Sequence, residues 1–258
     1  MWDPSTYLRF DDERSRPFVD LLARVPAGKP RAVVDLGCGP GHLTARLADR
    51  WPAARVHGID SSPEMIDKAR AAGYPIDVTV GDLRDWLPDP DVDVVVSNAA
   101  LQWVPGHDEL LRRWAGALAP GAHLAVQVPG NFDAPSHRAL RAVAATFAPL
   151  AGLVREAPVR DPSGYAELLR AAGCQVDAWE TTYLHQLPVV PGGDHPVLSW
   201  MEGTALRPVR AALDAGDWGV FRATLGERLL DHYPARGNVV FFPFRRIFFV
   251  ATVGGLSA

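Results

Sequence analysis

At residues 33–41 the chain reads Val33-Val34-Asp35-Leu36-Gly37-Cys38-Gly39-Pro40-Gly41, and this stretch decides the fold. A short apolar run ends near an acidic residue, three glycines follow at alternate positions, and a helical pattern begins at His42. Glycine has no Cβ, so its backbone can bend sharply and a ligand can approach it closely. The dinucleotide fingerprint G-x-G-x-x-G would place its third glycine at position 42, where this chain has histidine. The stretch therefore predicts a strand, a ligand-binding turn and a helix, with the wrong spacing for a pyrophosphate.

Four further segments follow the turn in the order expected of an alternating α/β sheet. Arg55–Asp60 is a second apolar run that ends in an acid, 23 residues after Gly37. An acid about 20 residues beyond a glycine-rich turn accepts hydrogen bonds from ribose hydroxyls in nucleotide-binding folds. Three later runs follow. Val78–Leu83 ends in Gly-Asp-Leu, Val92–Asn98 ends in an asparagine, and Leu118–Val128 contains a Pro-Gly turn followed by an apolar strand. Between these runs, Ser62 and Pro63 predict the start of a helix.

Length and composition indicate a globular protein with one sizeable core. The chain has 258 residues, of which 48% are hydrophobic and 22% are charged. A formal net charge of −4 argues against a general nucleic-acid binder, which needs a basic face. Cys38 and Cys174 give neither a disulfide framework nor metal-ligand spacing. No apolar run approaches the roughly 20 residues of a membrane helix, and the polar N-terminus is unlike a signal peptide. We therefore expect a cytoplasmic protein without a metal, a membrane or an obligate protein partner.

The order of strand and helix patterns predicts one domain over residues 1–258 with three segments. Residues 1–30 include a helix over 14–23 and are expected to form a lid segment. Residues 31–130 alternate strands and helices, which predicts a cofactor-binding core with a mostly parallel sheet. Residues 131–258 are expected to supply a helical substrate cap and closing strands, from patterns at 137–149, 162–172, 174–187, 195–234 and 239–253. Pro243 predicts an interruption of the last strand.

The five ordered strand segments resemble the class I S-adenosylmethionine-dependent methyltransferases. The outlying segments resemble one family within that class, the trans-aconitate 2-methyltransferases, which esterify a carboxylate of a small tricarboxylic acid. The stretches that carry this resemblance are Trp2–Phe10, Glu13–Pro17, Gly58–Pro63, Leu101–Trp103, Thr181–Gln186, Gly203–Pro208 and Phe242-Pro243 with the run from Arg246 to Ala251. The resemblance implies a Rossmann-like sheet with an antiparallel last strand and helical cap insertions. It also implies removal of a spontaneously formed inhibitor of central metabolism.

The same resemblance implies a cofactor site for S-adenosylmethionine and a neighbouring site for a small polycarboxylate. The residues implied to hold the cofactor are Arg14, Asp35, Gly37, Gly39, Gly41, Asp60, Asp82, Leu83 and Asn98. The residues implied to line the substrate site are Tyr7, Gln102, Trp103, His185, Arg207 and Arg246. Plainer alternatives stay open: Trp103 can be core, His185 can fill one face of a strand, and either arginine can be a surface charge. Extra residues near Phe244 leave open whether Arg245 or Arg246 takes the family position.

The expected chemistry needs alignment more than proton transfer. A sulfonium methyl group is already activated, and a carboxylate is already a nucleophile at neutral pH, so in-line displacement requires proximity and no general base. Charge is lost as anion meets cation, so a dry pocket favours the reaction. An arginine paired with the reacting oxygen would reduce its nucleophilicity. Arginines should instead hold the other carboxylates through their bidentate fork, while Trp103 could wall the pocket and exclude water.

Three other functions remain open from the sequence. A methyltransferase of the same fold could act on another small metabolite, such as a phenol, an amine or a different acid. A non-catalytic cofactor-binding protein could keep the fold without turnover, although the intact motifs argue against it. A dehydrogenase that binds NAD is disfavoured because His42 stands where the third glycine of the fingerprint would lie.

Overall fold

The computed structural model describes residues 11–154 and 159–254, which form two compact units. The first, here called the sheet unit, comprises residues 14–129, 159–181 and 246–254. The second, here called the helical unit, comprises residues 11–13, 130–154 and 182–245. The single domain over residues 1–258, with its lid, core and cap segments, stays a prediction.

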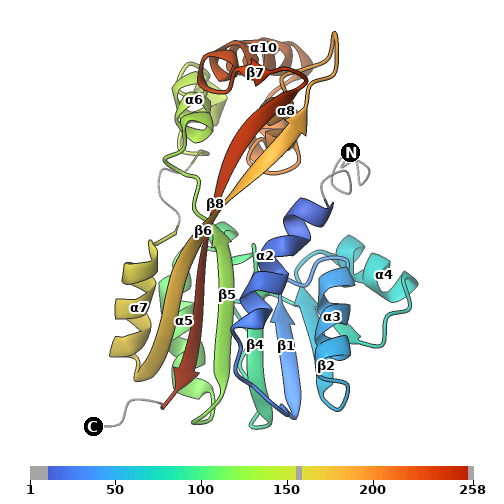
Figure 1. Cartoon of the computed structure of the whole chain (residues 1–258), viewed down its shortest axis with the longest axis vertical. Coiled ribbons are helices and arrows are strands. Elements are labelled where there is room, and N and C mark those ends of the chain that lie inside the picture. Colours follow the sequence, from blue (N-terminus) through green and yellow to red (C-terminus); the bar gives the residue numbers. More distant parts are fainter. Residues whose placement is uncertain (1–10, 155–158, 255–258) are drawn as a thin grey trace. The chain divides into compact units, whose positions relative to one another are not determined.

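The strands form one mixed sheet. Their bounds are β1 Ala32–Leu36, β2 Arg55–Asp60, β3 Asp77–Val80, β4 Val92–Asn98, β5 His123–Pro129, β6 Cys174–Pro188, β7 Ala235–Arg236 and β8 Val239–Val253. They follow the order β3-β2-β1-β4-β5-β8-β6, with the short β7 paired to β8 (Figure 1). β1 pairs in parallel with β2 and β4, and β3 and β5 continue in the same direction. β8 runs antiparallel to β5. The structure thus confirms the Rossmann-like sheet expected from the sequence, mostly parallel with an antiparallel last strand.

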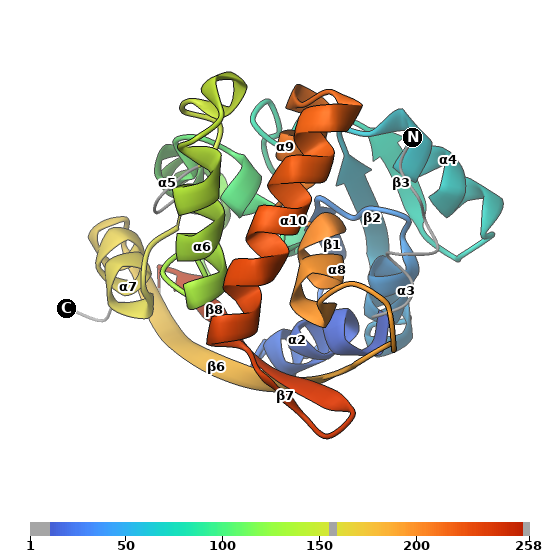
Figure 2. The ribbon, with the colours of Figure 1, turned by 90° about the horizontal axis from the view of Figure 1, so that it is seen from above.

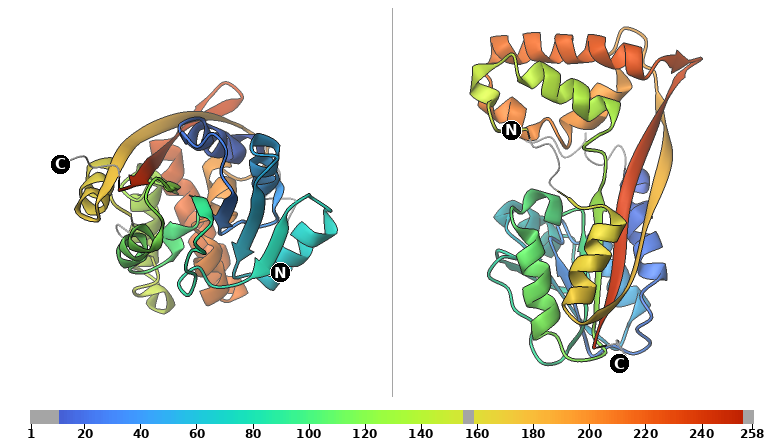
Figure 3. Two further views of the ribbon diagram at one scale, coloured as in Figure 1. Left: turned by 90° about the horizontal axis from the view of Figure 1, so that it is seen from below. Right: turned by 90° about the vertical axis from the view of Figure 1, so that its left-hand side faces the viewer.

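In the sheet unit, helices cover both faces of the strands. They are α2 Asp11–Ala23, α3 His42–Arg50, α4 Pro63–Ala71, the 3-10 turn η1 Leu101–Trp103, α5 His107–Ala117 and α7 Pro162–Ala171. α2 lies on one face, and α5 and α7 lie on the other (Figure 3). Under α5 and α7, the buried side chains of Trp114 and Tyr165 pack in one core with Phe249 of β8. On α2, which covers the helix that the sequence predicted over residues 14–23, Phe18 and Leu21 are completely buried. With both faces covered, a ligand is expected at the carboxyl ends of the strands.

The helical unit packs its helices around aromatic side chains. They are α6 Pro135–Ala144, the 3-10 turn η2 Ala148–Leu150, α8 Pro196–Glu202, α9 Arg207–Ala212 and α10 Ala215–His232. α10 lies between α6 and α8 and contacts both (Figure 2). Trp200, Phe221 and Phe242 are buried in this unit. Within residues 195–234, one of the patterns from which the sequence predicted a helical cap and closing strands, the structure has α8, α9 and α10. Among all the described helices, none combines the length and the apolar character that a membrane crossing needs.

The expected interruption of the last strand at Pro243 is wrong. β8 is continuous from Val239 to Val253, and Pro243 is an exposed residue within it. β5 pairs with β8 only from Arg246 onward. At Pro243, β8 therefore has no β5 neighbour whose carbonyl oxygen would need an N–H donor. Pro243 is in an edge position on this side, where a strand tolerates proline.

Candidate functional site

The glycine turn that joins β1 to α3 is shaped by three residues with left-handed backbone. The φ angles of Gly37, Gly39 and Gly41 are +84°, +56° and +80°. A Cβ at Gly37 would lie 2.4 Å from the Cβ of Ala100, and a Cβ at Gly41 would lie 3.0 Å from its nearest side-chain neighbour. At Gly39, by contrast, a Cβ would meet nothing within 4 Å. Packing therefore excludes a side chain at Gly37 and leaves little room for one at Gly41, whereas the space beside Gly39 is open to a ligand.

Asp60, at the end of β2, holds the glycine turn in place. Its Oδ2 accepts a hydrogen bond of 2.9 Å from the backbone N–H of Gly39, and its Oδ1 accepts one of 2.9 Å from that of Ser62. Ser62 in turn caps α4, as expected, because its Oγ accepts from the backbone N–H of Met65. A carboxylate oxygen can accept more than one hydrogen bond. Asp60 therefore orders the turn and can still accept further hydrogen bonds.

Asp35 is a buried acid on β1, directly beneath the turn. It is 3% exposed, and its Oδ2 accepts a hydrogen bond of 2.6 Å from Thr44 Oγ1 of α3. Burial raises the pKa of Asp35 to about 7, with the Thr44 hydrogen bond acting in the opposite direction and repulsion from Asp60 adding to the rise. At neutral pH the protonated and ionised forms of this carboxyl group are therefore present in similar amounts. A cation bound nearby would favour the ionised form.

Asp82 and Leu83 follow β3 at the same end of the sheet. The backbone N–H of Gly81 donates to the carbonyl oxygen of Asp60, which joins the ends of β2 and β3. The side chain of Asp82 accepts hydrogen bonds of 2.8 Å from the backbone N–H of Arg84 and 2.5 Å from its Nη2. The Arg84 guanidinium and backbone N–H hold the pKa of Asp82 below its usual range. Leu83 is partly buried against the core of the sheet unit. Binding of the cofactor by Asp82 and Leu83 stays a prediction.

The segment that follows β4 combines a strained backbone with buried polar atoms. Asn98 Oδ1 is buried and has no hydrogen-bond partner among the described residues. Ala99 has a φ of +54°, a costly conformation for a residue other than glycine. Gln102 Nε2 donates to the Ala99 carbonyl oxygen at 2.6 Å, while Gln102 Oε1 is buried without a partner in the described chain. Trp103 is 53% exposed, which rules out the alternative that it is a core residue. Orphaned acceptors and backbone strain are both typical of ligand sites.

The expected substrate residues are distributed over both units. Gln102, Trp103 and Arg246 belong to the sheet unit, and His185 and Arg207 belong to the helical unit. The ring of His185 is buried and stacks on Trp200 with centroids 4.7 Å apart, which agrees with the packing alternative. Arg207 is exposed at the start of α9. Tyr7 lies outside the described residues, and Arg14 belongs to α2 with its side chain outside the description.

The two arginines that the sequence left open differ in burial and in their contacts. Arg245 is half-buried, its backbone N–H donates to Asn131 Oδ1 at 2.8 Å, and its Nη1 donates to the Gly130 carbonyl oxygen at 3.4 Å. Arg246 is only 6% exposed and lies opposite Pro129 of β5. Successive residues of a strand point to opposite faces. The buried Arg246 is therefore the arginine to consider for the sheet unit.

Two buried polar residues beside these groups were not expected from the sequence. Thr44 was missed, although it lies on the first turn of the helix that the glycine turn opens and bonds Asp35. Gln127 was missed as well. It is 1% exposed in β5, and neither atom of its side-chain amide has a partner among the described residues. The available signal for Gln127 was a single polar residue inside the apolar run Leu124–Val128.

Comparisons with known proteins identify the family of this chain. A family model described as a methyltransferase domain matches residues 33–121. A trans-aconitate 2-methyltransferase of Mycobacterium tuberculosis (strain ATCC 25177 / H37Ra) is 56% identical over 262 residues, covering 99% of this chain and 98% of that protein. Another, from Mycolicibacterium gilvum (strain PYR-GCK), is 57% identical over 260 residues, covering 98% of this chain and 99% of that protein. The chain belongs to the trans-aconitate 2-methyltransferase family.

Solved structures with a similar fold are more distant. The phosphoethanolamine N-methyltransferase 2 of Haemonchus contortus, solved with S-adenosyl-L-methionine, aligns with a TM-score of 0.56 at 16% identity, covering 92% of this chain and 52% of that one. A chain from the complex of the Haloferax volcanii Trm112 methyltransferase activator with a methyltransferase aligns with a TM-score of 0.58 at 22% identity, covering 96% of this chain and 93% of that one. At such identities these similarities show the fold of this trans-aconitate 2-methyltransferase family member and nothing more.

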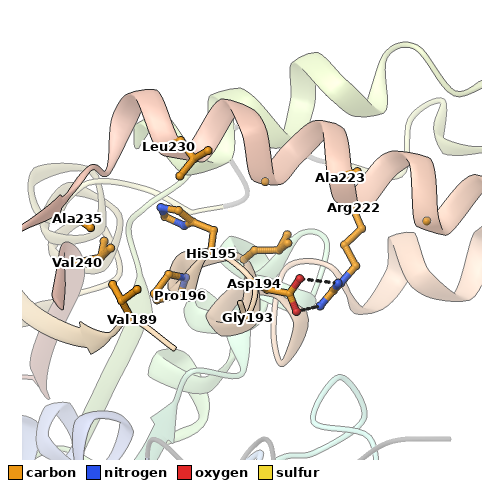
Figure 4. A pocket seen from close by; sticks show the side chains of 13 residues that line it. Val189, Gly193, Asp194, His195, Pro196, Arg222, Ala223, Leu230, Ala235 and Val240 are labelled. Atoms are coloured by element: carbon orange, nitrogen blue, oxygen red, sulfur yellow. Dashed lines mark hydrogen bonds and ion pairs between the residues drawn. The ribbon is translucent and has the colours of Figure 1, made fainter. Parts of the chain in front are cut away.

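A separate pocket of about 440 Å³ lies within the helical unit of this family member (Figure 4). Apolar side chains, including Val189 and Leu230, form part of its lining. The guanidinium of Arg222 in its lining is already paired, because it donates to Asp194 at 2.8 Å and to Glu202, outside the lining, at 2.5 Å. Among the described residues that line it, no arginine is left over for a polycarboxylate. We therefore do not assign the substrate to this pocket.

Proposed function

We propose that this chain transfers the methyl group of S-adenosylmethionine to a carboxylate of trans-aconitate, or of a closely related small polycarboxylic acid, and forms a monomethyl ester. The observation that carries the proposal is the 56% identity, over nearly the full length of both chains, to a trans-aconitate 2-methyltransferase. Such coverage includes the segments outside the methyltransferase core, where substrate recognition resides.

The groups at the glycine turn fit a cationic methyl donor. When bound, S-adenosylmethionine supplies a methyl group that its sulfonium has already activated. The space beside Gly39 is open, and Asp35 and Asp60 place two acids next to the turn. Asn98 Oδ1 adds a buried acceptor with no partner in the described chain, suited to an ammonium group. The Asp35 carboxylate beneath the turn would repel a pyrophosphate, so this residue favours a cation over a dinucleotide.

The substrate side of the proposal rests on charge and burial. Arg246 is a buried cation on β8, and Trp103 is an exposed aromatic ring directly after the strained Ala99 segment. A guanidinium binds a carboxylate through two parallel hydrogen bonds, which orients a polycarboxylate without touching the carboxylate that reacts. In this scheme Arg246 holds a carboxylate that does not react, and Arg207 is a second candidate for that task.

The described residues supply no obvious general base, and the proposed chemistry needs none. Burial, with the nearby charges of Asp35 and Asp60, raises the pKa of the Cys38 thiol far above neutral pH. His107 Nε2 lies 2.8 Å from the hydroxyl of Tyr165, a core residue of the sheet unit. A carboxylate acceptor is already ionised at neutral pH. The contribution of the chain is therefore to bind, orient and dehydrate the two reactants.

An acceptor panel tests the proposal. The protein is incubated with methyl-labelled S-adenosylmethionine and, separately, with trans-aconitate, other di- and tricarboxylic acids, monocarboxylic acids, phenols and amines. The expected result is the highest kcat/KM with trans-aconitate or a close polycarboxylate. Preference for a neutral or cationic acceptor would instead support a methyltransferase for a different metabolite. Tight donor binding with no transfer to any acceptor would support a binding protein without turnover.

The proposal extends to the place of action. We propose that the chain acts in the cytoplasm, because small polycarboxylates related to central metabolism occur there. The proposed reaction involves a donor and an acceptor of low molecular weight, and it requires neither a nucleic acid nor a membrane.

A further inference from the structure

Gln127 is a buried side chain whose hydrogen-bonding capacity is unused. It lies in β5 at 1% exposure, and both Oε1 and Nε2 lack a partner among the described residues. Its neighbours along the strand, Val126 and Val128, are fully buried apolar residues. A buried amide without partners costs stability, and an apolar side chain of the same shape would avoid that cost. A residue that breaks the local rule in this way is typical of a binding site.

The register of the sheet aligns Gln127 with two residues already considered. Asn98 of β4 is the register partner of Gln127, so the two side chains share one face of the sheet. Gln127 is also the register partner of Phe248 in β8. Arg246 lies two residues from Phe248 and points to the same face, because side chains alternate along a strand. Asn98, Gln127 and Arg246 therefore form a row across three neighbouring strands near one end of the sheet.

This row begins at the glycine turn. Asp35 is the register partner of Val96, which lies two residues before Asn98 on β4. Asp35, Asn98, Gln127 and Arg246 thus lie on one face, in the strand order β1, β4, β5, β8. The acid lies at the donor end of the row and the arginine lies at the other end. The neutral amide of Gln127 lies between them, all within the sheet unit.

We propose that Gln127 binds the acceptor carboxylate, with Nε2 donating a hydrogen bond to one of its oxygens. This inference rests on the proposed function. A neutral amide suits that position, because it orients the reacting carboxylate without the full positive charge that would reduce its nucleophilicity. In this scheme Arg246, on the adjacent strand, holds a second carboxylate of the same molecule. The row therefore selects acids with two carboxylates, one facing the amide and one facing the guanidinium.

A structural role for Gln127 makes a different prediction. Asn98 and Gln127 are register neighbours, so a change of side-chain rotamer could let their amides bond each other. Loss of such a bond would lower the stability of the unliganded protein and leave acceptor binding unchanged. Acceptor binding by Gln127 makes the opposite prediction for both quantities.

The test replaces Gln127 by methionine, which keeps the length of the side chain and removes the amide. Leu124→Met is the matched control, because Leu124 is fully buried in β5 and a Leu-to-Met exchange is well tolerated. The unliganded Tm of each protein is measured, with the Kd of S-adenosylmethionine and the KM and kcat for trans-aconitate. For Gln127→Met we expect a KM about 10- to 100-fold higher, the loss of one hydrogen bond to a charged group. The donor Kd should stay within about twofold, and the Tm should be equal to or above that of the wild type.

Each outcome decides the matter. An unchanged KM in Gln127→Met, or a lower Tm with the same KM as Leu124→Met, would overturn the assignment of Gln127. If the wild-type protein transfers no methyl group to trans-aconitate, the proposed function fails, and Gln127 is judged on stability alone. In that case a lower Tm for Gln127→Met would mark a structural residue, and a higher Tm would support an amide kept for a ligand.

Discussion

Replacing Asp35 by asparagine should make the unliganded protein more stable and, at the same time, weaken its binding of the methyl donor. Asparagine has the same shape as aspartate and can still accept the hydrogen bond of Thr44 Oγ1 through its amide oxygen. What it removes is a carboxylate charge at a site that is 3% exposed. The substitution therefore separates the charge of residue 35 from its packing.

The size of the effect follows from the pKa of Asp35. Burial raises it from 3.8 to about 7, a difference that corresponds to about 4 kcal/mol. Because the folded-state pKa lies above the unfolded-state value, this acid favours folding most below about pH 4. That contribution is lost as the pH rises through about 7. Asp35→Asn has no such loss, so its advantage over the wild type should grow by about 2–3 kcal/mol between pH 5 and pH 8.

Urea unfolding of both proteins at pH 5, 6, 7 and 8, without ligand, measures this difference. A second titration, by calorimetry at pH 8, measures the Kd of S-adenosylmethionine, which should be at least tenfold higher for Asp35→Asn. If the difference in unfolding free energy does not depend on pH, the pKa of Asp35 is not raised in the folded protein. A variant that is less stable than the wild type at pH 8 would refute the reasoning outright.

Four further predictions concern the turn, the pH dependence and Arg207. Gly37→Ala should lose about 2–4 kcal/mol of unfolding free energy in urea, because its Cβ would lie 2.4 Å from the Cβ of Ala100 at a φ of +84°. Gly39→Ala should lose only about 1 kcal/mol but raise the donor Kd at least tenfold by filling the open space; equal Kd values for it and the wild type would contradict the site. With the donor saturating, kcat should stay flat from pH 7 to pH 9, and a rise with an apparent pKa near 7 would reveal a catalytic base. Arg207→Ala should raise the KM for trans-aconitate by an amount equivalent to about 2 kcal/mol, with little change in donor binding; an unchanged KM would make Arg207 a surface charge.

The sequence predicts the cofactor end of the fold well because the signals there are local. A strand that ends in an acid, glycines that need positive φ and a Ser-Pro helix start are all defined by neighbouring residues. The structure bears out the strand over Val92–Asn98 and the helix start at Ser62. The double hydrogen bond of Asp60 to Gly39 and Ser62 follows from the same local arrangement.

The residues that we propose for the substrate were harder to predict, because they depend on register and burial between distant segments. Gln127 is significant only once Asn98 and Phe248 are known to lie beside it. Burial of His185 against Trp200 depends on how β6 and α8 pack together, which alternation along one strand does not reveal. The continuous path of β8 through Pro243 likewise depends on where β5 ends. A pattern read along one chain segment contains no information about such partners.

The nature of the labelled product tests the central claim most directly. The wild-type protein is incubated with methyl-labelled S-adenosylmethionine and trans-aconitate, and the product is isolated and treated with mild alkali. A monomethyl ester predicts a product one methyl group heavier than trans-aconitate, from which alkali releases all of the label as methanol. A label that withstands alkali, or that never leaves the donor in the presence of trans-aconitate, would contradict carboxylate methylation by this chain.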